Sequence, residues 1–269
     1  MGVTQSLEEE GMNVDRFHLY RQMFRSRRFE EAVNRLWHEG YVLAEMHPSL
    51  GEEGIAAGVV AALEEGDALA LEHRSPAPLV IRGADLFSVL VEMLGEREPA
   101  RPRAAGPTAV GFALAAERLS PGKIAVAFLG DGTINPTTLL ESMRLAVAAR
   151  LAVLFVGKGG ELGERARAVG MEVAEVDGSD AVAVAEAAQA AVERARRGLG
   201  PSFVRAHSGR PLVRSGRAGR LASTPNPRRR DPVKRLRRQL ARYGTRLDLL
   251  EREVESEIEH VLARAARGR

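Results

Sequence analysis

An aspartate between two glycines is the feature of this sequence best suited to chemistry. Gly130, Asp131 and Gly132 directly follow an apolar run at residues 124–129, which predicts a buried β-strand. The glycines let the backbone turn sharply and approach a phosphate, and the carboxylate can bind a hard cation. In open α/β sheets, ligands bind at the carboxyl ends of the strands. This position predicts a metal–phosphate site, although a strand-to-helix turn in which Asp131 caps the next helix explains the same residues.

Strands and helices alternate through the middle of the chain, and their order predicts the fold. Buried strands are expected at residues 67–71, 124–129, 151–156, 172–176 and 202–206. Helices are expected between the later strands, near residues 137–149 and 180–196. This alternation is typical of an α/β fold with a doubly wound, mostly parallel sheet. Right-handed crossovers place the loops after residues 129 and 156 at the same edge of that sheet.

Helical extensions are predicted on both sides of the alternating region. Helices are expected from Asn13 or Asp15 to about Glu39, and at residues 51–63, 86–94 and 107–117. The pattern around Thr245 resembles a capping box and predicts the start of a C-terminal helix. Its apolar stripe must cover a surface, either on this chain or on a partner, and consists of Leu250, Val254, Ile258 and Leu262.

The composition divides the chain into four parts. We expect a disordered N-terminus at residues 1–12 and an α/β domain at residues 13–206. A basic loop or arm follows at residues 207–230, and a C-terminal helical segment at residues 231–269 packs on the domain or on a partner. Loops are expected at residues 95–106 and 157–163, where glycines and prolines cluster.

The charge and the missing cysteines exclude several classes of function. The chain of 269 residues contains no cysteine, so disulfides, zinc–thiolate sites and cysteine nucleophiles are excluded. The net charge is +3, with arginines concentrated between Arg205 and Arg238. That block could attract a polyanion, but it lacks the aromatic residues on which nucleic-acid bases stack. A solvated basic loop, or a loop that faces an acidic partner, is therefore favoured over nucleic-acid binding. Without a signal peptide or an apolar stretch of membrane-spanning length, we expect a cytoplasmic protein without a membrane partner.

Six motifs, in the same order, resemble the alpha subunit of thiamine diphosphate-dependent 2-oxo acid dehydrogenases, the decarboxylating component. They are residues 50–58 (LGEEGIAAG), His73-Arg74, residues 130–132 with Glu141 in the next helix, residues 175–181 (EVDGSDA), residues 198–203 (GLGPSF) and residues 231–236 (DPVKRL). The resemblance covers roughly residues 17–266 and implies the thiamine diphosphate-binding fold. Glu141 is expected to be a structural or interface carboxylate.

The resemblance implies roles for five residues. Asp131 would bind the Mg²⁺ that bridges the diphosphate of the cofactor, with Gly132 and Thr133 lining the phosphates. His73 and Arg74 occupy the place of a Tyr-Arg pair that reaches the diphosphate, and a guanidinium suits that role. An ion pair between Arg74 and Glu72, with a structural His73, is the alternative.

The resemblance also implies an oxidoreductase reaction shared between subunits. The thiazolium ylid of the cofactor acts as the electron sink in decarboxylation of a 2-oxo acid, and the acyl group passes to a lipoyl carrier on an acyltransferase. In this family the glutamate that activates the cofactor comes from a beta-type subunit in an α2β2 heterotetramer. No catalytic residue is therefore assigned to this chain. His207, at the end of the last strand, is expected to be structural rather than catalytic.

The sequence departs from the family pattern at the cofactor edge. Gly160 stands where the resemblance places an asparagine that is the second Mg²⁺ ligand, and Lys158 brings a positive charge nearby. The loops at residues 96–105, 161–167 and 208–211 are shortened or replaced. An alternative is therefore a catalytically degenerate structural subunit that supports a catalytic beta-type partner. A third is a basic polyanion-binding protein, whose affinity would fall steeply with salt.

Overall fold

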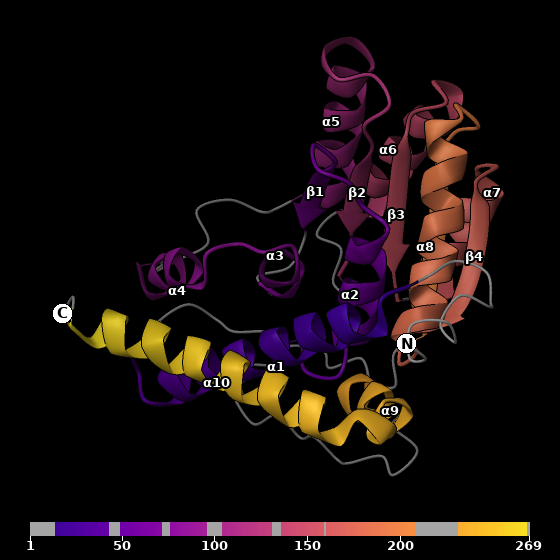
Figure 1. Cartoon of the computed structure of the whole chain (residues 1–269). Helices are drawn as coiled ribbons and strands as arrows, with labels where there is room; N and C mark the ends of the chain where they lie inside the picture. Colours follow the sequence, from indigo (N-terminus) through magenta and orange to yellow (C-terminus); the bar gives the residue numbers. More distant parts are fainter. Residues whose placement is uncertain are drawn as a thin grey trace.

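A parallel β-sheet with helices on both faces forms one part of the protein (Figure 1). The computed structural model describes residues 14–42, 49–71, 76–95, 104–130, 136–158, 160–207 and 231–267. Within these residues the strand order is β1-β2-β3-β5-β4, and every neighbouring pair is parallel. The predicted parallel α/β fold is confirmed. The strands are β1 (Ala68–Leu71), β2 (Ala125–Phe128), β3 (Val153–Gly157), β4 (Glu172–Asp177) and β5 (Ser202–His207).

Helices cover both faces of the sheet. One face packs on α5 (Ala105–Leu119), α6 (Pro136–Ala148) and α7 (Gly160–Ala168). The other packs on α2 (Glu53–Ala61) and α8 (Ala181–Arg196). The chain moves in one direction from β1 through β3 to β4 and then reverses to β5, so right-handed crossovers put α8 on the opposite face from α5, α6 and α7. Because the sheet is covered twice, β3 is buried along its whole length.

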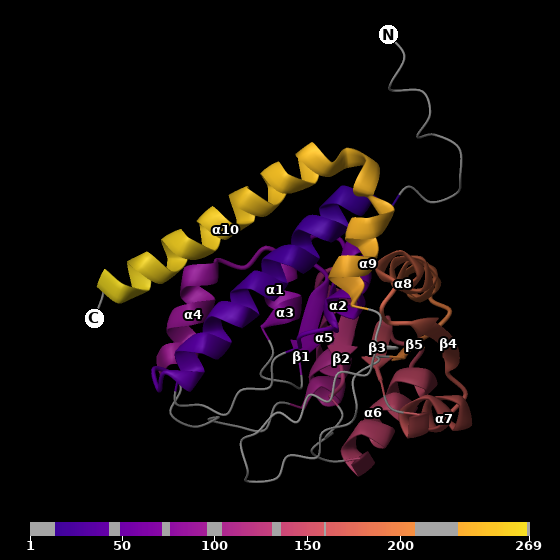
Figure 2. The same ribbon diagram turned by 90° about the horizontal axis from the view of Figure 1, so that it is seen from below.

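A second group of helices lies beyond α2 (Figures 1 and 2). Here α1 (Arg16–His38) and α10 (Gly244–Arg267) run side by side, and both views agree on this. The shorter members are α3 (Ala77–Ile81), α4 (Leu86–Gly95), α9 (Pro232–Gln239) and the 3₁₀ turn η1 (Ala241–Tyr243). None of the helices in the described part of the chain is both long enough and apolar enough to cross a membrane.

The apolar stripe of the C-terminal helix covers this chain itself. Val254 is fully buried and Ile258 nearly so, and both belong to one cluster with Phe29 and Val33 of α1 and Leu90 of α4. Leu250 and Leu262 are partly buried against the same cluster. The stripe therefore packs within this chain, against α1 and α4.

The predicted helix starts are mostly correct. Asp15 caps α1, since its Oδ1 accepts hydrogen bonds from the amides of Phe17 at 2.9 Å and His18 at 3.0 Å. The start of α10 was predicted at Thr245, but η1 leads directly into a helix that begins at Gly244. The loop predicted at residues 157–163 is too long, because α7 begins at Gly160.

Some parts of the predicted domain division lie outside the described residues. They are residues 1–12 and 208–230, and the predictions for them stay predictions. His207 was assigned to the start of the basic arm, but it is the last residue of β5. Its backbone carbonyl accepts the amide of Gly178, which ties the end of β5 to the turn after β4.

Glycines bring two of the sequence motifs into direct contact. A Cβ added to Gly58 on α2 would lie 2.7 Å from Cβ of Val184 on α8. A Cβ added to Gly178, in the turn before α8, would lie 2.8 Å from Cγ1 of Ile55. Such distances are well below an ordinary contact, so only glycine lets α2 approach α8 this closely. The motifs at residues 50–58 and 175–181 therefore determine helix packing.

Candidate functional site

The predicted cofactor residues all lie outside the described part of the chain. They are His73, Arg74, Asp131, Gly132 and Thr133. The structure does describe the residues from which these segments leave the sheet: Leu71 ends β1 and Gly130 comes two residues after the end of β2. The roles assigned to the five residues stay predictions.

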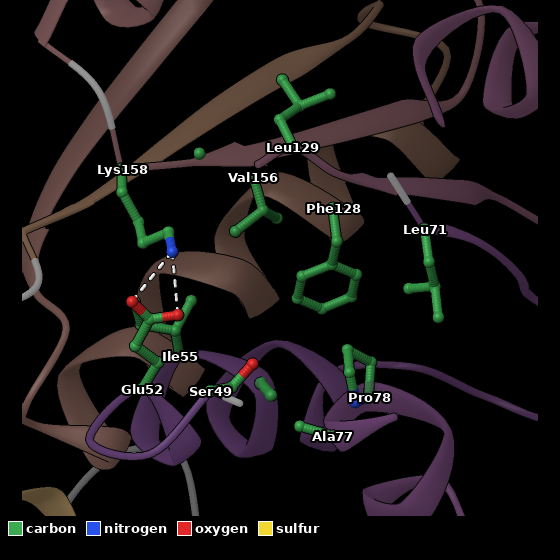
Figure 3. Close-up of a pocket in the computed structure, with 12 residues that line it drawn as sticks. Ser49, Glu52, Ile55, Leu71, Ala77, Pro78, Phe128, Leu129, Val156 and Lys158 are labelled. Atoms are coloured by element: carbon green, nitrogen blue, oxygen red, sulfur yellow. Dashed lines mark hydrogen bonds and ion pairs between the residues drawn. The ribbon is translucent and has the colours of Figure 1, made fainter. Parts of the chain in front are cut away.

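A cavity opens at the carboxyl ends of β1, β2 and β3, the edge where the sequence predicts a ligand site (Figure 3). The strand register places Leu71 beside Phe128 and Phe128 beside Val156, so the three strands end level. Ile55 of α2 and Pro78 of α3 close the opposite side. The walls are apolar, and the polar groups gather at one end.

A buried ion pair forms that polar end. Lys158 follows β3, and its Nζ lies 2.8 Å from both carboxylate oxygens of Glu52. The two side chains are only 16% and 10% exposed. Figure 3 shows Lys158 reaching from the sheet toward Glu52 at the start of α2. Removing two charges from water costs several kcal/mol per ion by typical estimates, about what a good pair recovers.

The carboxylate of Glu52 does not cap the helix at whose start it lies. Glu52 occupies the N-cap position of α2, but its side chain makes no capping hydrogen bond. Instead its backbone amide donates to the carbonyl of Ser49 at 2.8 Å, and its carboxylate turns to Lys158. The pair therefore depends on a contact between α2 and β3, which the sequence pattern around Glu52 does not predict.

The described side chains at this edge do not make a magnesium site. Glu52 is the one carboxylate among the described residues that line the cavity, and Lys158 already binds it. Gly160 begins α7 and has no side-chain oxygen to offer. Nowhere in the described ranges do three or more His, Asp or Glu residues come together as metal ligands. A hard cation needs several oxygen ligands, so the described residues of this edge do not make a Mg²⁺ site by themselves.

The next residue, Glu53, points away from the cavity to Arg27. Glu53 is 1% exposed, and its Oε2 accepts from Nη2 of Arg27 at 3.0 Å and from the amide of Gly51 at 2.9 Å. Arg27 also donates to Asp231 at 3.1 Å. Burial disfavours the charged guanidinium, but the Glu53 and Asp231 carboxylates outweigh it and raise the pKa of Arg27. Arg27 therefore joins the motifs at residues 50–58 and 231–236.

A second ionic cluster lies on the far strands of the sheet. Glu175 of β4 accepts from Arg167 at 2.6 Å and from Arg205 at 3.2 Å, and its Oε2 lies 3.0 Å from Nε2 of His207. The hydrogen bond from Arg167, followed by that from His207, lowers the pKa of Glu175 to about 2. His207 therefore takes part in an exposed ion cluster on β4 and β5.

Two of the basic residues near the C-terminus are neutralised within the chain. Arg235 pairs with Asp177 at 2.7 Å and also with Asp180. Arg237 pairs with Asp248 at 3.1 Å and with Glu251 at 2.8 Å. These contacts tie α9 to the turn before α8 and to α10. They give no support to binding of a polyanion by these two arginines.

Glu141 has a local partner and no part in the cavity. It lies on the exposed side of α6 and pairs with Arg144, one turn along, at 2.8 Å. Both side chains are more than half exposed, so the pair contributes little to stability.

Comparison with known proteins gives a consistent result. The dehydrogenase E1 component family matches residues 21–106 and 100–267. The alpha subunit of acetoin:2,6-dichlorophenolindophenol oxidoreductase from Bacillus subtilis is 30% identical over 238 residues, covering 74% of this chain and 72% of that protein. The corresponding alpha subunit from Cupriavidus necator is 28% identical over 293 residues, covering 92% and 88%. The pyruvate dehydrogenase E1 component subunit alpha from Porphyra purpurea is 26% identical over 275 residues, covering 82% and 78%.

Proposed function

The chain belongs to the dehydrogenase E1 component family, and from this premise we propose that it is the alpha-type subunit of a thiamine diphosphate-dependent dehydrogenase that decarboxylates a 2-oxo acid. The observation that carries the proposal is the cavity at the level carboxyl ends of β1, β2 and β3. It combines apolar walls with the Lys158–Glu52 ion pair at one end, which suits a ligand with an apolar body and a charged tail.

The residues at the carboxyl ends of β1 and β2 would each have a role in binding the cofactor. Thiamine diphosphate, when bound, supplies the thiazolium ylid that serves as electron sink. Asp131, Gly132 and Thr133 follow β2 and would hold the metal and phosphates, while His73 and Arg74 follow β1 and would reach the diphosphate. The apolar side chains of Leu71 and Phe128 would keep water from the reacting end.

The remaining groups belong to partners. We propose a beta-type subunit in an α2β2 assembly, which would supply the glutamate that activates the cofactor, and a lipoyl-bearing acyltransferase that accepts the acyl group. The three relatives support this, since each is named as an alpha subunit. In this proposal Mg²⁺ depends on Asp131, because the described residues at the edge do not make a site for it.

Acetoin is a second candidate substrate. It is favoured by the names of two of the three relatives described above, both of which are acetoin oxidoreductase subunits. Acetoin has no carboxylate to lose, so the two candidates differ in a measurable product. Pyruvate with dichlorophenolindophenol as electron acceptor would release CO₂, whereas acetoin would reduce the dye without CO₂.

Titration calorimetry with thiamine diphosphate and Mg²⁺ tests the proposal. The samples are this chain alone and this chain mixed with its beta-type subunit. We expect binding by the mixture, weakened by about tenfold or more in Asp131→Ala. Glu64→Ala removes an exposed carboxylate outside the cavity and should bind as the wild type does. If neither sample binds thiamine diphosphate, the chain is not a subunit of such an enzyme.

A further inference from the structure

The Lys158–Glu52 pair is more than the fold needs to join α2 to β3. Glycine contacts and the apolar cluster around Ile55 and Val156 already hold α2 against the sheet and α8. An apolar pair of similar volume often stabilises a protein as well as a buried ion pair does. Moreover, both charged side chains line the cavity, and Glu52, at the N-cap of α2, makes no capping hydrogen bond. These facts point to a function for the charges themselves.

We propose that the Lys158 ammonium binds the diphosphate group of the ligand, and that Glu52 is a placeholder which the diphosphate displaces. The inference rests on the proposed function and deepens it by naming the anion-binding group. The Lys158 ammonium would also neutralise part of the diphosphate charge, as a divalent cation does. It lies at an edge where the described residues do not form a metal site.

The geometry supports an exchange of partners. Lys158 follows β3 at the same edge as the other strand ends, and its Nζ lies 2.8 Å from each oxygen of the Glu52 carboxylate. An ammonium is a compact point charge with rotatable donors, so it can pass from a carboxylate to a phosphate oxygen by a small rotation of its stem. The start of α7 at Gly160, two residues later, adds a helix N-terminus that also favours an anion.

The two partners should then respond in opposite directions. Lys158→Met removes the ammonium, so binding of a diphosphate should weaken by about tenfold or more. Glu52→Gln removes the competing carboxylate and nearly preserves its shape, so binding should tighten by a few-fold to about tenfold. Lys158→Arg keeps the charge and should retain binding. A pair that only held the fold together would not give opposite signs.

The experiment is titration calorimetry on the full chain with and without its beta-type subunit. The probes are inorganic pyrophosphate and thiamine diphosphate, each in excess EDTA and in Mg²⁺ at constant ionic strength. Lys123→Met is the matched control, because Lys123 pairs with Glu64 at 3.3 Å outside this cavity. Thermal melting of each variant checks the fold, and if Lys158→Met does not fold, Glu52→Gln and Lys158→Arg still test the inference.

The expected result is binding of pyrophosphate in EDTA that Lys158→Met weakens and Glu52→Gln strengthens, with no change in Lys123→Met. Binding that requires Mg²⁺, or that ignores both cavity variants, overturns the role of Lys158. In that case the proposed function still stands if the mixture binds thiamine diphosphate with Mg²⁺. Conversely, pyrophosphate binding through Lys158 without any thiamine diphosphate binding would keep this site and reject the proposed cofactor.

Discussion

The guanidinium of Arg27 on α1 is hydrogen-bonded to the carboxylate of Asp231, which lies 204 residues later in the chain, at 3.1 Å. The same guanidinium binds Glu53 at the start of α2. Arg27 is only 15% exposed in its side chain, so three segments that are distant in sequence meet on one largely desolvated cation. The N-cap of α9 is thus fixed by a residue near the N-terminus.

Replacing Asp231 separates its two tasks. Its Oδ1 caps α9 by accepting from the amides of Val233 at 3.0 Å and Lys234 at 3.1 Å, and its carboxylate also pairs with Arg27. Asparagine caps a helix about as well as aspartate, so Asp231→Asn loses mainly the ion pair. Asp231→Ala loses the cap as well, and its free energy of unfolding should be lower by about a further 1 kcal/mol. Urea denaturation measures both, and equal losses would mean that the cap contributes nothing.

Acid should weaken the same contact. Burial favours the neutral carboxyl of Asp231, but the hydrogen bond from Arg27 outweighs it and lowers the pKa below its unfolded value of about 3.9. The contribution of Asp231 to stability is therefore complete above that pH and is lost as the pH falls through the lowered native pKa. Asp231 is partly solvent-exposed, so we expect the loss to stay below about 1 kcal/mol. From pH 7 to pH 2 the free energy of unfolding should fall more steeply for the wild type than for Asp231→Asn. Parallel pH dependences would contradict a stabilising role for the ionised Asp231 carboxylate.

Two helical glycines should respond to alanine with opposite signs. In Gly58→Ala the new methyl group would collide with Val184 and with the carbonyl of Ala181, so we expect a loss of about 1–3 kcal/mol in the free energy of unfolding. Gly111 on α5 has no atom near its Cβ position, so Gly111→Ala should add about 0.5–1 kcal/mol. Chemical denaturation of both variants checks the pair, and a stable Gly58→Ala would show that α2 does not lie this close to α8.

The stability of the isolated chain tests whether the stripe on α10 is internal. Ile258 is 5% exposed, so Ile258→Ala should cost about 2–5 kcal/mol even without any partner. Leu249 is 55% exposed on the same helix, and Leu249→Ala should change stability by less than about 0.5 kcal/mol. Similar melting temperatures for the two variants would mean that the stripe is not buried in the isolated chain and is free to contact a partner.

The fold could be predicted from the sequence because its strongest signals are local. The strand runs are continuous and apolar, as in sheets covered on both faces, and β3 is buried throughout. The helix α3 was not predicted, since its five residues are too few to show a period. At α7, Gly160 and Gly163 obscure the true start of the helix.

The position of the site followed from the parallel sheet, but its contacts did not. Lys158 was expected to bring positive charge to this edge, and the structure places it there. Its partner Glu52 lies 106 residues earlier in the chain, and no local pattern connects the two. The pairing of Glu53 with Arg27 was missed for the same reason. Asp231 was noted only as part of a motif, so neither its capping role nor the cation that holds it was predicted.

Glu52 and Glu53 are consecutive residues that face different ways, one toward the cavity and the other toward the helices at the far side of α2. A helix advances by about 100° per residue, so a one-residue insertion between these glutamates and Gly58 would rotate both carboxylates away from their partners while the rest of α2 stayed on α8. The ion pair of Glu52 at the cavity and the ion pair of Glu53 with Arg27, which also binds the start of α9, would be lost together. The length of this turn therefore keeps both carboxylates in register with their partners.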